Sequence, residues 1–505
     1  MHTLKRFMLA ASAALIIGGQ ATAQEASNAA AEDRGGFIDM LVGFIHWLDS
    51  IVFMNVDMFG ASVKPIVVWM GAPMLLLTIY FGFVNLNSFR RAWKVGSGHY
   101  HDPSADGEVT QFQALSTALS GTVGLGNIAG VAAAISLGGP GATFWMILIG
   151  LCAMTLKFSE CTLGVKYRVV HADGTVSGGP MHYLKRGLAA RGWKKTGTIL
   201  GWTYALLALP SLLQIATVNQ IYESLTVVTG IDGVGYQWGF GIALAALTAV
   251  IIIGGIQSIA KVTSRLVPLM AFIYISAALV IILGNIGQVP AAFVTIFHGA
   301  FTPEGVAGGV VGVIVIGMQR AVYSTEAGLG SATMAHAAAK TNEPMSEGMV
   351  ALMEPFIDTV VICTMTALVI VISGVYKGAD GIEGVSLTAS AFATVISWFP
   401  AVLAVAAFLF GFSTIISWGY YCSKIWEFIF GGSARSMTIY KTVYCAAIIP
   451  GAVFTLGEVY TLMNSLFFLM AVPNIIGIYL MAPELKRDLK SYLARLKSGE
   501  IQETR

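Results

Sequence analysis

The residues best suited to ligand chemistry lie in one glycine-rich run, Ser120-Gly-Thr-Val-Gly-Leu-Gly-Asn127, within an apolar segment at about 110 to 138. Three glycines in six positions argue against a regular membrane-spanning helix, because glycine costs about 1 kcal/mol relative to alanine in a helix. A break at bilayer depth is tolerated only where the freed backbone groups are buried in protein or face a water-filled cavity. Amides that start the second half-helix then suit a carboxylate, and carbonyls that end the first half suit a small cation. Close packing of small residues between helices is the alternative for this run taken alone.

The composition describes a polytopic membrane protein. Of the 505 residues, 56% are hydrophobic and only 11% are charged, and these values exclude a water-soluble domain. The net charge of +2 gives no indication of a nucleic-acid partner. The five cysteines lie in or beside apolar segments without a CxxC pair, which is typical of small apolar residues rather than of disulfides or metal ligands.

The chain begins with a predicted signal peptide at 1–23. Lys5 and Arg6 precede an apolar run that is too short to span a membrane, and Ala21-Thr-Ala23 follows as a cleavage site. An uncleaved anchor is the alternative. We expect residues 24–62 to form a periplasmic segment with an amphipathic helix at the outer interface, at 37–54.

Apolar segments of about spanning length follow, and we count eleven. They lie at about 63–87, 110–138, 141–164, 198–228, 236–256, 266–285, 305–335, 349–373, 399–429, 438–456 and 459–482. Lysine and arginine concentrate in the cytoplasmic loops of membrane proteins. If the amino terminus is external, only Arg34, Lys64 and Lys377 of the 27 lysine and arginine residues after the signal lie on the outer side. The pattern predicts a bacterial inner-membrane protein with a periplasmic amino terminus and a cytoplasmic tail at 483–505.

A short internal repeat links the second and seventh segments. Val123-Gly-Leu-Gly-Asn-Ile-Ala129 has a counterpart in Ala327-Gly-Leu-Gly-Ser-Ala332, five crossings later. An odd number of crossings makes the two helices run in opposite directions. Paired interrupted helices in two inverted halves indicate the binding site of a secondary transporter.

On these stretches the chain resembles the alanine/glycine:cation symporter family, within the leucine-transporter-like superfamily. The resemblance rests on FQALSTALSGTVGLGNIAGVAAAISLGGPGATFWM (112–146), GGPMHYL (178–184), RAVYSTEAGLGSATMAHAAA (320–339), FIDTVVICTMTALVIV (356–371) and FGFSTIISWGYY (410–421). It implies an all-α transporter domain at 63–482, built from inverted repeats of five helices each at about 110–285 and 305–482. One additional helix at 63–87 precedes them.

The resemblance also implies two ligand groups. Main-chain amides would hold the substrate carboxylate at Gly124, Leu125, Gly126 and Asn127. The carbonyls of Ser120 and Val123 and the hydroxyls of Ser413 and Thr414 match the superfamily's shared sodium site, and hard oxygen ligands are what an alkali cation needs. The alternative for the two hydroxyls is a hydrogen bond back to their own helix.

The chain departs from the family pattern at two places. Arg320-Ala-Val-Tyr-Ser-Thr-Glu-Ala-Gly328 replaces the usual Arg-Gly-(Val/Met)-Phe-Ser-Asn-Glu-Ala-Gly run, and Gln214-Ile-Ala-Thr-Val-Asn219 replaces Gly-Asn-Met-x-Gln-Ala-Asn. Gln214 and Thr217 therefore stand where a polar substrate contact is expected. The remaining predicted substrate residues are Thr122, Gly317 and Trp418. Arg320 and Glu326 flank the second break and would brace it or form an inner gate.

Charges inside spanning segments are expensive and indicate function by default. Lys157 and Glu160 are spaced for an ion pair on a helix surface. Glu354 lies at the start of the eighth segment, where the helix dipole stabilises a carboxylate, so helix capping is the expected role of Glu354. Capping explains Asp358 less well, because it lies further into the segment. Phe144 and Trp145, with Trp418, would wall the substrate cavity or serve packing.

No catalytic motif competes with transport: HExxH, GxxxxGK[ST] and GxSxG are absent, and His99 and His101 in a polar loop do not indicate a metal site. The sequence thus predicts a Na+-coupled symporter of a small neutral amino acid, alanine or glycine, without a cofactor. Proton coupling through Glu326 or Asp358 is the alternative, and a channel or membrane sensor is a more distant one. The oligomeric state stays open.

Overall fold

The protein is described by a computed structural model that covers residues 36–58, 60–100, 102–302, 306, 308–378, 384–395, 398–453 and 457–501. The predicted signal peptide, residues 24–35 and His101 lie outside this range. The described chain is helical apart from two antiparallel two-stranded sheets. The sheets pair β1 (Val56–Met58) with β2 (Ala61–Val63), and β3 (Val169–Val170) with β4 (Val176–Ser177).

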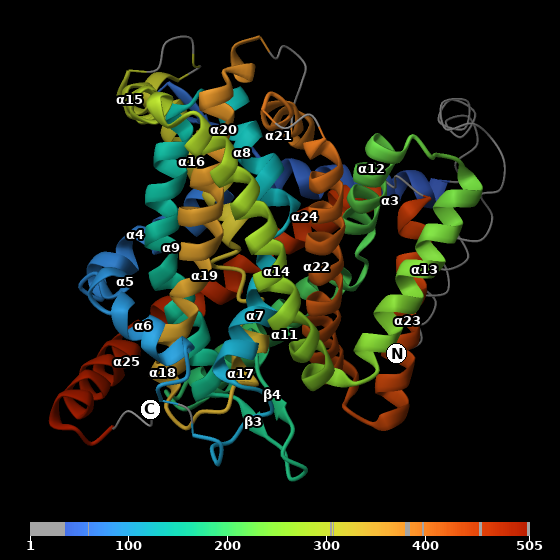
Figure 1. Ribbon diagram of the computed structural model, residues 1–505. Helices are drawn as coiled ribbons and strands as arrows, with labels where there is room; N and C mark the ends of the chain where they lie inside the picture. Colours follow the sequence, from blue (N-terminus) through green and yellow to red (C-terminus); the bar gives the residue numbers. More distant parts are fainter. Residues whose placement is uncertain are drawn as a thin grey trace.

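The helices form one bundle around a continuous apolar core (Figure 1). In chain order they are α3 (Gly36–Val52), α4 (Pro65–Tyr80), α5 (Val84–Asn87), α6 (Phe89–Gly96), α7 (Gln111–Thr122), α8 (Leu125–Gly138), α9 (Gly141–Lys166), α10 (Pro180–Ala189), α11 (Lys194–Ala208), α12 (Ile215–Thr229), α13 (Val234–Ile252), α14 (Gly255–Gly284), α15 (Val289–Phe301), α16 (Gly309–Thr325), α17 (Thr333–Ala337), α18 (Pro344–Ala351), α19 (Met353–Pro355), α20 (Thr364–Ser373), α21 (Gly384–Ala393), α22 (Phe399–Phe430), α23 (Ala434–Ile448), α24 (Gly457–Leu469) and α25 (Ala471–Ser498). A π-helix at Phe356–Cys363 joins α19 to α20.

The glycine-rich run interrupts its helix, as predicted. Helix α7 ends at Thr122, and Val123 and Gly124 both adopt extended backbone angles. Helix α8 begins at Leu125, and the axes of the two half-helices differ by 46°. We call residues 123 and 124 the first break.

The second predicted interruption is longer and lies between α16 and α17. Glu326, Gly328 and Gly330 have φ angles of 50°, 98° and 77°, so the chain cannot continue as a right-handed helix there. Helix α16 packs against α8 and α17 packs against α7, and in Figure 1 the chain rises from α7 to α8 and descends from α16 to α17. The two broken segments therefore cross the bundle in opposite directions. We call residues 326–332 the second break.

When helices are judged by their length and composition, fewer of them can span a membrane than the eleven that we expected. Seven helices of the described chain are long and apolar enough to cross a membrane, or eight if α7 and α8 are one bent span. The difference arises because α4, α16 and α23 have only 16, 17 and 15 residues. The expected count of eleven is thus not confirmed.

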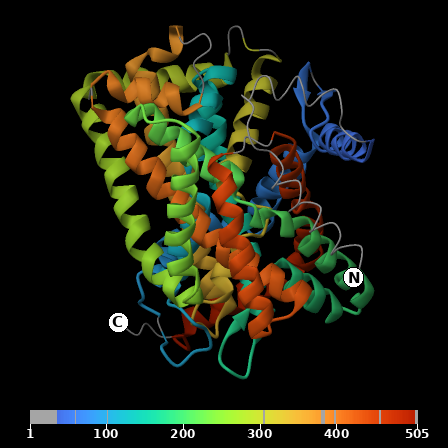
Figure 2. The same cartoon turned by 90° about the vertical axis from the view of Figure 1, so that its right-hand side faces the viewer.

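The amphipathic helix predicted at 37–54 is present as α3, which lies at the edge of the bundle against α24 (Figures 1 and 2). Asp49 Oδ1 accepts a hydrogen bond of 2.9 Å from Ser465 Oγ, and the rings of Phe53 and Phe468 pack edge to face. Helix α3 therefore supports α24 from outside.

The charges on α9 are arranged differently from the ion pair that we expected between Lys157 and Glu160. Lys157 is fully buried, and its Nζ lies 3.0 Å from Glu354 Oε2. Glu354 is also fully buried inside a continuous helical stretch, so it does not cap a helix start.

A buried histidine joins Glu354 to a second carboxylate. Glu354 Oε1 lies 2.8 Å from His336 Nε2, and His336 Nδ1 lies 2.6 Å from Glu347 Oε1. Because a carboxylate only accepts, a His336 ring that carries both protons satisfies both contacts. Two cations then face two carboxylates and tie α9, α17, α18 and α19 together.

This arrangement predicts that Lys157→Met is strongly destabilising. Breaking a buried ion pair by removing one partner costs about 3–5 kcal/mol, because the remaining charge stays buried. We expect a clearly lower unfolding temperature of the detergent-purified protein. Lys185→Met is the control, because Lys185 is exposed on α10. Equal unfolding temperatures for the two variants would show that the buried pair does not hold these helices.

Candidate functional site

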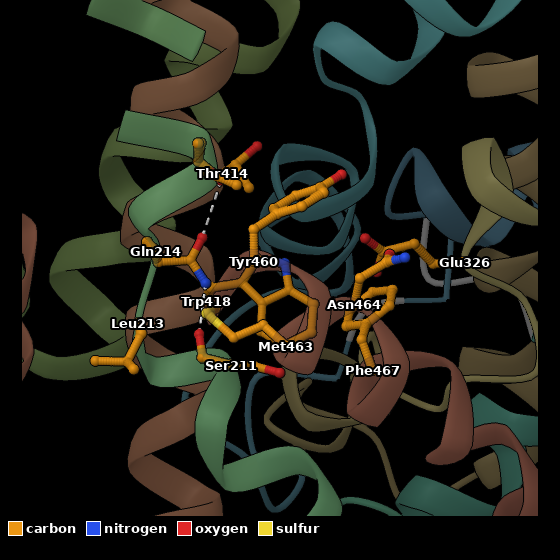
Figure 3. A pocket seen from close by; sticks show the side chains of 12 residues that line it. Ser211, Leu213, Gln214, Glu326, Thr414, Trp418, Tyr460, Met463, Asn464 and Phe467 are labelled. Atoms are coloured by element: carbon orange, nitrogen blue, oxygen red, sulfur yellow. Dashed lines mark hydrogen bonds between the residues drawn. The ribbon is translucent and has the colours of Figure 1, made fainter. Parts of the chain in front are cut away.

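A cavity of about 210 Å³ lies between the first turn of α12, α22, α24 and the second break (Figure 3). We call it the central pocket. Gln214 and Thr414 stand on one side of it and Glu326 on the other, with Tyr460 and Trp418 between them in this view. Its lining residues are Ser211, Leu213, Gln214, Ala216, Thr217, Glu326, Thr414, Trp418, Tyr460, Met463, Asn464 and Phe467.

Gln214 owes its position to a break that the sequence did not lead us to expect within 198–228. A 3-10 turn at Leu209–Leu212 separates α11 from α12, and Pro210 explains it because proline lacks the amide that a continuous helix needs. Gln214 Nε2 donates to Ser211 O at 2.6 Å, and Thr217 Oγ1 lies 3.3 Å from Gln214 Oε1. The carboxamide is therefore held at the pocket wall.

Helix α24 supplies four lining residues that we did not predict from the sequence. Tyr460, Met463, Asn464 and Phe467 share one helical face, since they are spaced three and four residues apart. The periodicity was visible within the predicted span 459–482. It could not show, however, which face of that helix meets a cavity.

The oxygens of Ser120, Ser413 and Thr414 come together as expected for an alkali-cation group. Ser413 Oγ and Thr414 Oγ1 lie 3.3 and 3.2 Å from Ser120 O. The same hydroxyls lie 2.8 and 3.0 Å from Phe410 O on their own helix, which is the back-bonded alternative. Each hydroxyl has one proton and two lone pairs, so it can donate to its own helix and still offer oxygen to a cation. Val123 is buried, but no contact among the described residues joins its carbonyl to this group.

Two of the four predicted amides at the first break already have acceptors within the chain. Gly124 N–H donates to Asn127 Oδ1 at 2.9 Å, and Asn127 N–H donates to Gly124 O at 3.1 Å. The amide of Gly126 donates to no acceptor among the described residues, as is usual in the first turn of a helix. A Cβ built on Gly124 would lie 3.7 Å from Thr414 Oγ1, so the first break adjoins the pocket wall.

At the second break, side chains satisfy the freed backbone. Glu160 Oε1 accepts from Gly328 N at 2.9 Å, and Asn474 Nδ2 donates to Gly328 O at 2.7 Å. Tyr204 OH donates to Leu329 O at 2.9 Å. These backbone groups are therefore occupied, and Glu326 is the residue of this break that reaches the central pocket.

The side chain of Asn127 ties the first break to the second repeat. Its Nδ2 contacts Ser324 Oγ at 3.1 Å and also Asp358 Oδ1. Asp358 is fully buried, and its Oδ2 accepts from Ser324 Oγ at 2.6 Å and from Thr359 Oγ1 at 2.7 Å. No ion pair joins Asp358 to a basic side chain among the described residues.

Several predicted site residues lie away from the central pocket. Thr122 Oγ1 lies 3.3 Å from Ala118 O of its own helix. Gly317 packs against α9, where a Cβ would lie 2.6 Å from Ala142 O, so it permits close helix contact rather than touching substrate. Arg320 lies on α16 six residues before Glu326 and does not line the pocket.

The aromatic pair on α9 does not wall the cavity either. Phe144 packs with Phe297 and Phe301 of α15, and Trp145 packs with Phe301, at ring distances of 5.4 to 5.8 Å. Of the three predicted aromatic residues, Trp418 lines the central pocket.

Comparisons with known proteins agree with this architecture. The family model of the sodium:alanine symporter family matches residues 46–505. The sodium/alanine symporter AgcS of Methanococcus maripaludis is 37% identical over 424 residues, which are 83% of this chain and 92% of that protein. The probable sodium/glutamine symporter GlnT of Bacillus subtilis is 34% identical over 396 residues, 78% of this chain and 80% of that protein.

A solved structure shows the fold. The crystal structure of MhsT in complex with L-phenylalanine is similar with a TM-score of 0.51 at 15% identity, and the match covers 75% of this chain and 89% of that one. The leucine-transporter-like fold predicted from the sequence is confirmed. The chain is an all-helical, multi-pass membrane protein that belongs to the sodium:alanine symporter family, a family of transporters and not of enzymes.

Proposed function

We propose that this protein carries a small neutral amino acid, alanine or glycine, together with Na+ by alternating access. The observation that carries the proposal is the meeting of three features. The start of α8 after the first break, the oxygen group of Ser120, Ser413 and Thr414, and one small cavity come together at Thr414, which lines the cavity and lies next to Gly124. Family membership supports sodium-coupled amino-acid symport as the class of reaction.

The central pocket supports a short, neutral side chain. Its volume of about 210 Å³ is below the roughly 300–1,000 Å³ of sites for drug-sized ligands. Apolar groups form much of the wall, and no lysine or arginine is among the described lining residues. A methyl group fits such a wall, whereas an acidic side chain would find no cationic partner.

The two ligands would be coupled through their charges. The amides of Leu125 and Gly126 at the start of α8 favour the carboxylate by hydrogen bonding and by the helix dipole. A Na+ ion on the oxygens of Ser120, Ser413 and Thr414 would lie at the same break and favour the same carboxylate. One charge moving through about 100 mV supplies about 2.3 kcal/mol, and a tenfold Na+ gradient supplies about 1.4 kcal/mol more. Together they support accumulation of several hundredfold.

The membrane arrangement is part of the proposal. Eleven crossings, with five-helix repeats at about 110–285 and 305–482, a periplasmic start and a cytoplasmic tail at 483–505, fit the distribution of basic residues. The bacterial inner membrane is the location that this arrangement and the signal at 1–23 suggest. On α3, Met40, Phe44, Trp47 and Ile51 are exposed at helical spacing, which supports a helix that lies at the interface.

Proton coupling is the second candidate, and one observation favours it. Asp358 is a fully buried carboxylate that receives hydrogen bonds from Asn127, Ser324 and Thr359 without a basic partner among the described residues. An intramembrane carboxylate of this kind is a default proton or ion site.

Uptake into proteoliposomes separates the two candidates. We expect radiolabelled alanine to accumulate only when an inward Na+ gradient is imposed, because Na+ binding supplies the driving force. A proton gradient at constant Na+ should give no accumulation. Accumulation under a proton gradient in Na+-free buffer would establish the proton mechanism instead.

Ser413→Ala combined with Thr414→Ala should abolish the Na+-stimulated part of alanine uptake while the protein remains folded. The change removes both hydroxyl ligands and leaves α22 intact. Ser423→Ala is the matched control, because Ser423 on the same helix bonds only to Tyr420 O among the described residues. Undiminished Na+ dependence in the double variant would rule out the proposed cation group.

Gly126→Leu should weaken alanine binding by at least about tenfold, because the side chain would crowd the position of the carboxylate. A Cβ at Gly126 meets nothing within 4 Å, so the variant is expected to fold. Gly130→Leu, one turn further along α8 and equally open, is the control. We would measure binding by alanine-induced thermal stabilisation in NaCl. Wild-type affinity in Gly126→Leu would count against the amide site.

A further inference from the structure

We propose that Glu326 binds the α-ammonium group of the transported amino acid, so that the protein selects α-amino acids over the corresponding hydroxy acids. This inference rests on the proposed function and adds the second recognition point for the zwitterion. It also changes our view of Glu326, which the sequence suggested as a gate or brace.

The backbone at Glu326 is held in an unusual conformation that directs its side chain to the central pocket. Its φ angle is 50°, and outside glycine only Phe83 shares a positive φ among the described residues. Such a conformation is costly for a residue with a Cβ and persists where the surrounding structure imposes it, often at functional sites. Glu326 follows the last residue of α16 as its carboxyl-terminal cap and lies directly before the braced part of the second break.

One carboxylate oxygen of Glu326 is held by a hydrogen bond, and the other is available to bind a ligand. Glu326 Oε2 accepts a hydrogen bond of 2.9 Å from Ser331 Oγ, which orients the group. Oε1 accepts no hydrogen bond within the described chain, and the side chain is part of the pocket wall. Figure 3 shows it across the pocket from Gln214 and Thr414.

The charges around the pocket favour a cation at this oxygen. No ion pair joins Glu326 to a basic residue in the described parts of the chain, and Lys157 is paired with Glu354. Lining groups other than Glu326 are neutral. A partly buried carboxylate without a cationic partner is costly, and an ammonium group brought by the substrate supplies the missing charge.

The two ends of the substrate fit the two sides of the site. In an α-amino acid the carboxylate and the ammonium group are attached to the same carbon, so their binding groups must face one another across a small cavity. Gly124, which directly precedes these amides in the chain, lies beside Thr414, because a Cβ built on it would be 3.7 Å from Thr414 Oγ1. Figure 3 shows Thr414 on the side of the pocket opposite Glu326. With zwitterion and Na+ bound, two positive charges meet the substrate carboxylate and Glu326, and the loaded site is neutral.

The test compares two ligands that differ only in the group assigned to Glu326. L-Alanine and L-lactate share the carboxylate and the methyl group, but lactate carries a hydroxyl in place of the ammonium. Their affinities are measured by ligand-induced thermal stabilisation of the purified full chain in saturating NaCl. The proteins are wild type, Glu326→Gln, Glu326→Asp and the control Glu223→Gln, an exposed carboxylate on α12.

We expect wild type and Glu223→Gln to bind alanine at least about tenfold more tightly than lactate. Glu326→Gln should lose about tenfold or more in alanine affinity with lactate affinity unchanged, and Glu326→Asp should fall between. Wild-type alanine affinity in Glu326→Gln, or a parallel loss of both ligands, would overturn the inference. If wild type itself shows no Na+-dependent alanine binding, the proposed function fails instead.

Discussion

In a membrane interior every backbone amide and carbonyl needs a partner within the protein, because lipid offers none. The first and second breaks both free backbone groups, and the chain treats these two breaks differently. Glu160, Asn474 and Tyr204 occupy the backbone of the second break. At the first break, the amide of Gly126 has no acceptor among the residues that the structure describes. A helix pair that looks symmetric in sequence thus has one structural member and one member whose backbone is open to a ligand.

The buried charges on α9 make this asymmetry possible. Glu160 stands on α9 within one turn of Lys157, and the two have separate partners. Lys157 and His336 balance the carboxylates Glu354 and Glu347, which fixes α17, α18 and α19 against α9. The second break is then held from several directions, and Glu326 can occupy a strained conformation at its edge. Rigid packing on one side of the pocket leaves the ligand groups on the other side free to respond to substrate and Na+.

The sequence revealed the elements whose signal is local. Glycine spacing showed both breaks. The place of Ser413 and Thr414 beside Ser120 was implied by the resemblance to the family and not by a local signal. It could not show contacts between distant helices. Lys157 and Glu160 are three residues apart, but their true partners come from elements more than a hundred residues later. The occupied amide of Gly124 was equally hidden, because it depends on the rotamer of Asn127. The number of spans was also hard to predict, because α4, α16 and α23 are shorter than the corresponding apolar segments of the sequence.

In the proposed mechanism, the open backbone of the first break holds the substrate carboxylate. The most direct measurement is an experimental structure of the protein with bound L-alanine and Na+. We expect the carboxylate oxygens to lie within hydrogen-bond distance of the Leu125 and Gly126 amides, with α7 and α8 still separated. A carboxylate held elsewhere, or a continuous helix through residues 120 to 127, would contradict it.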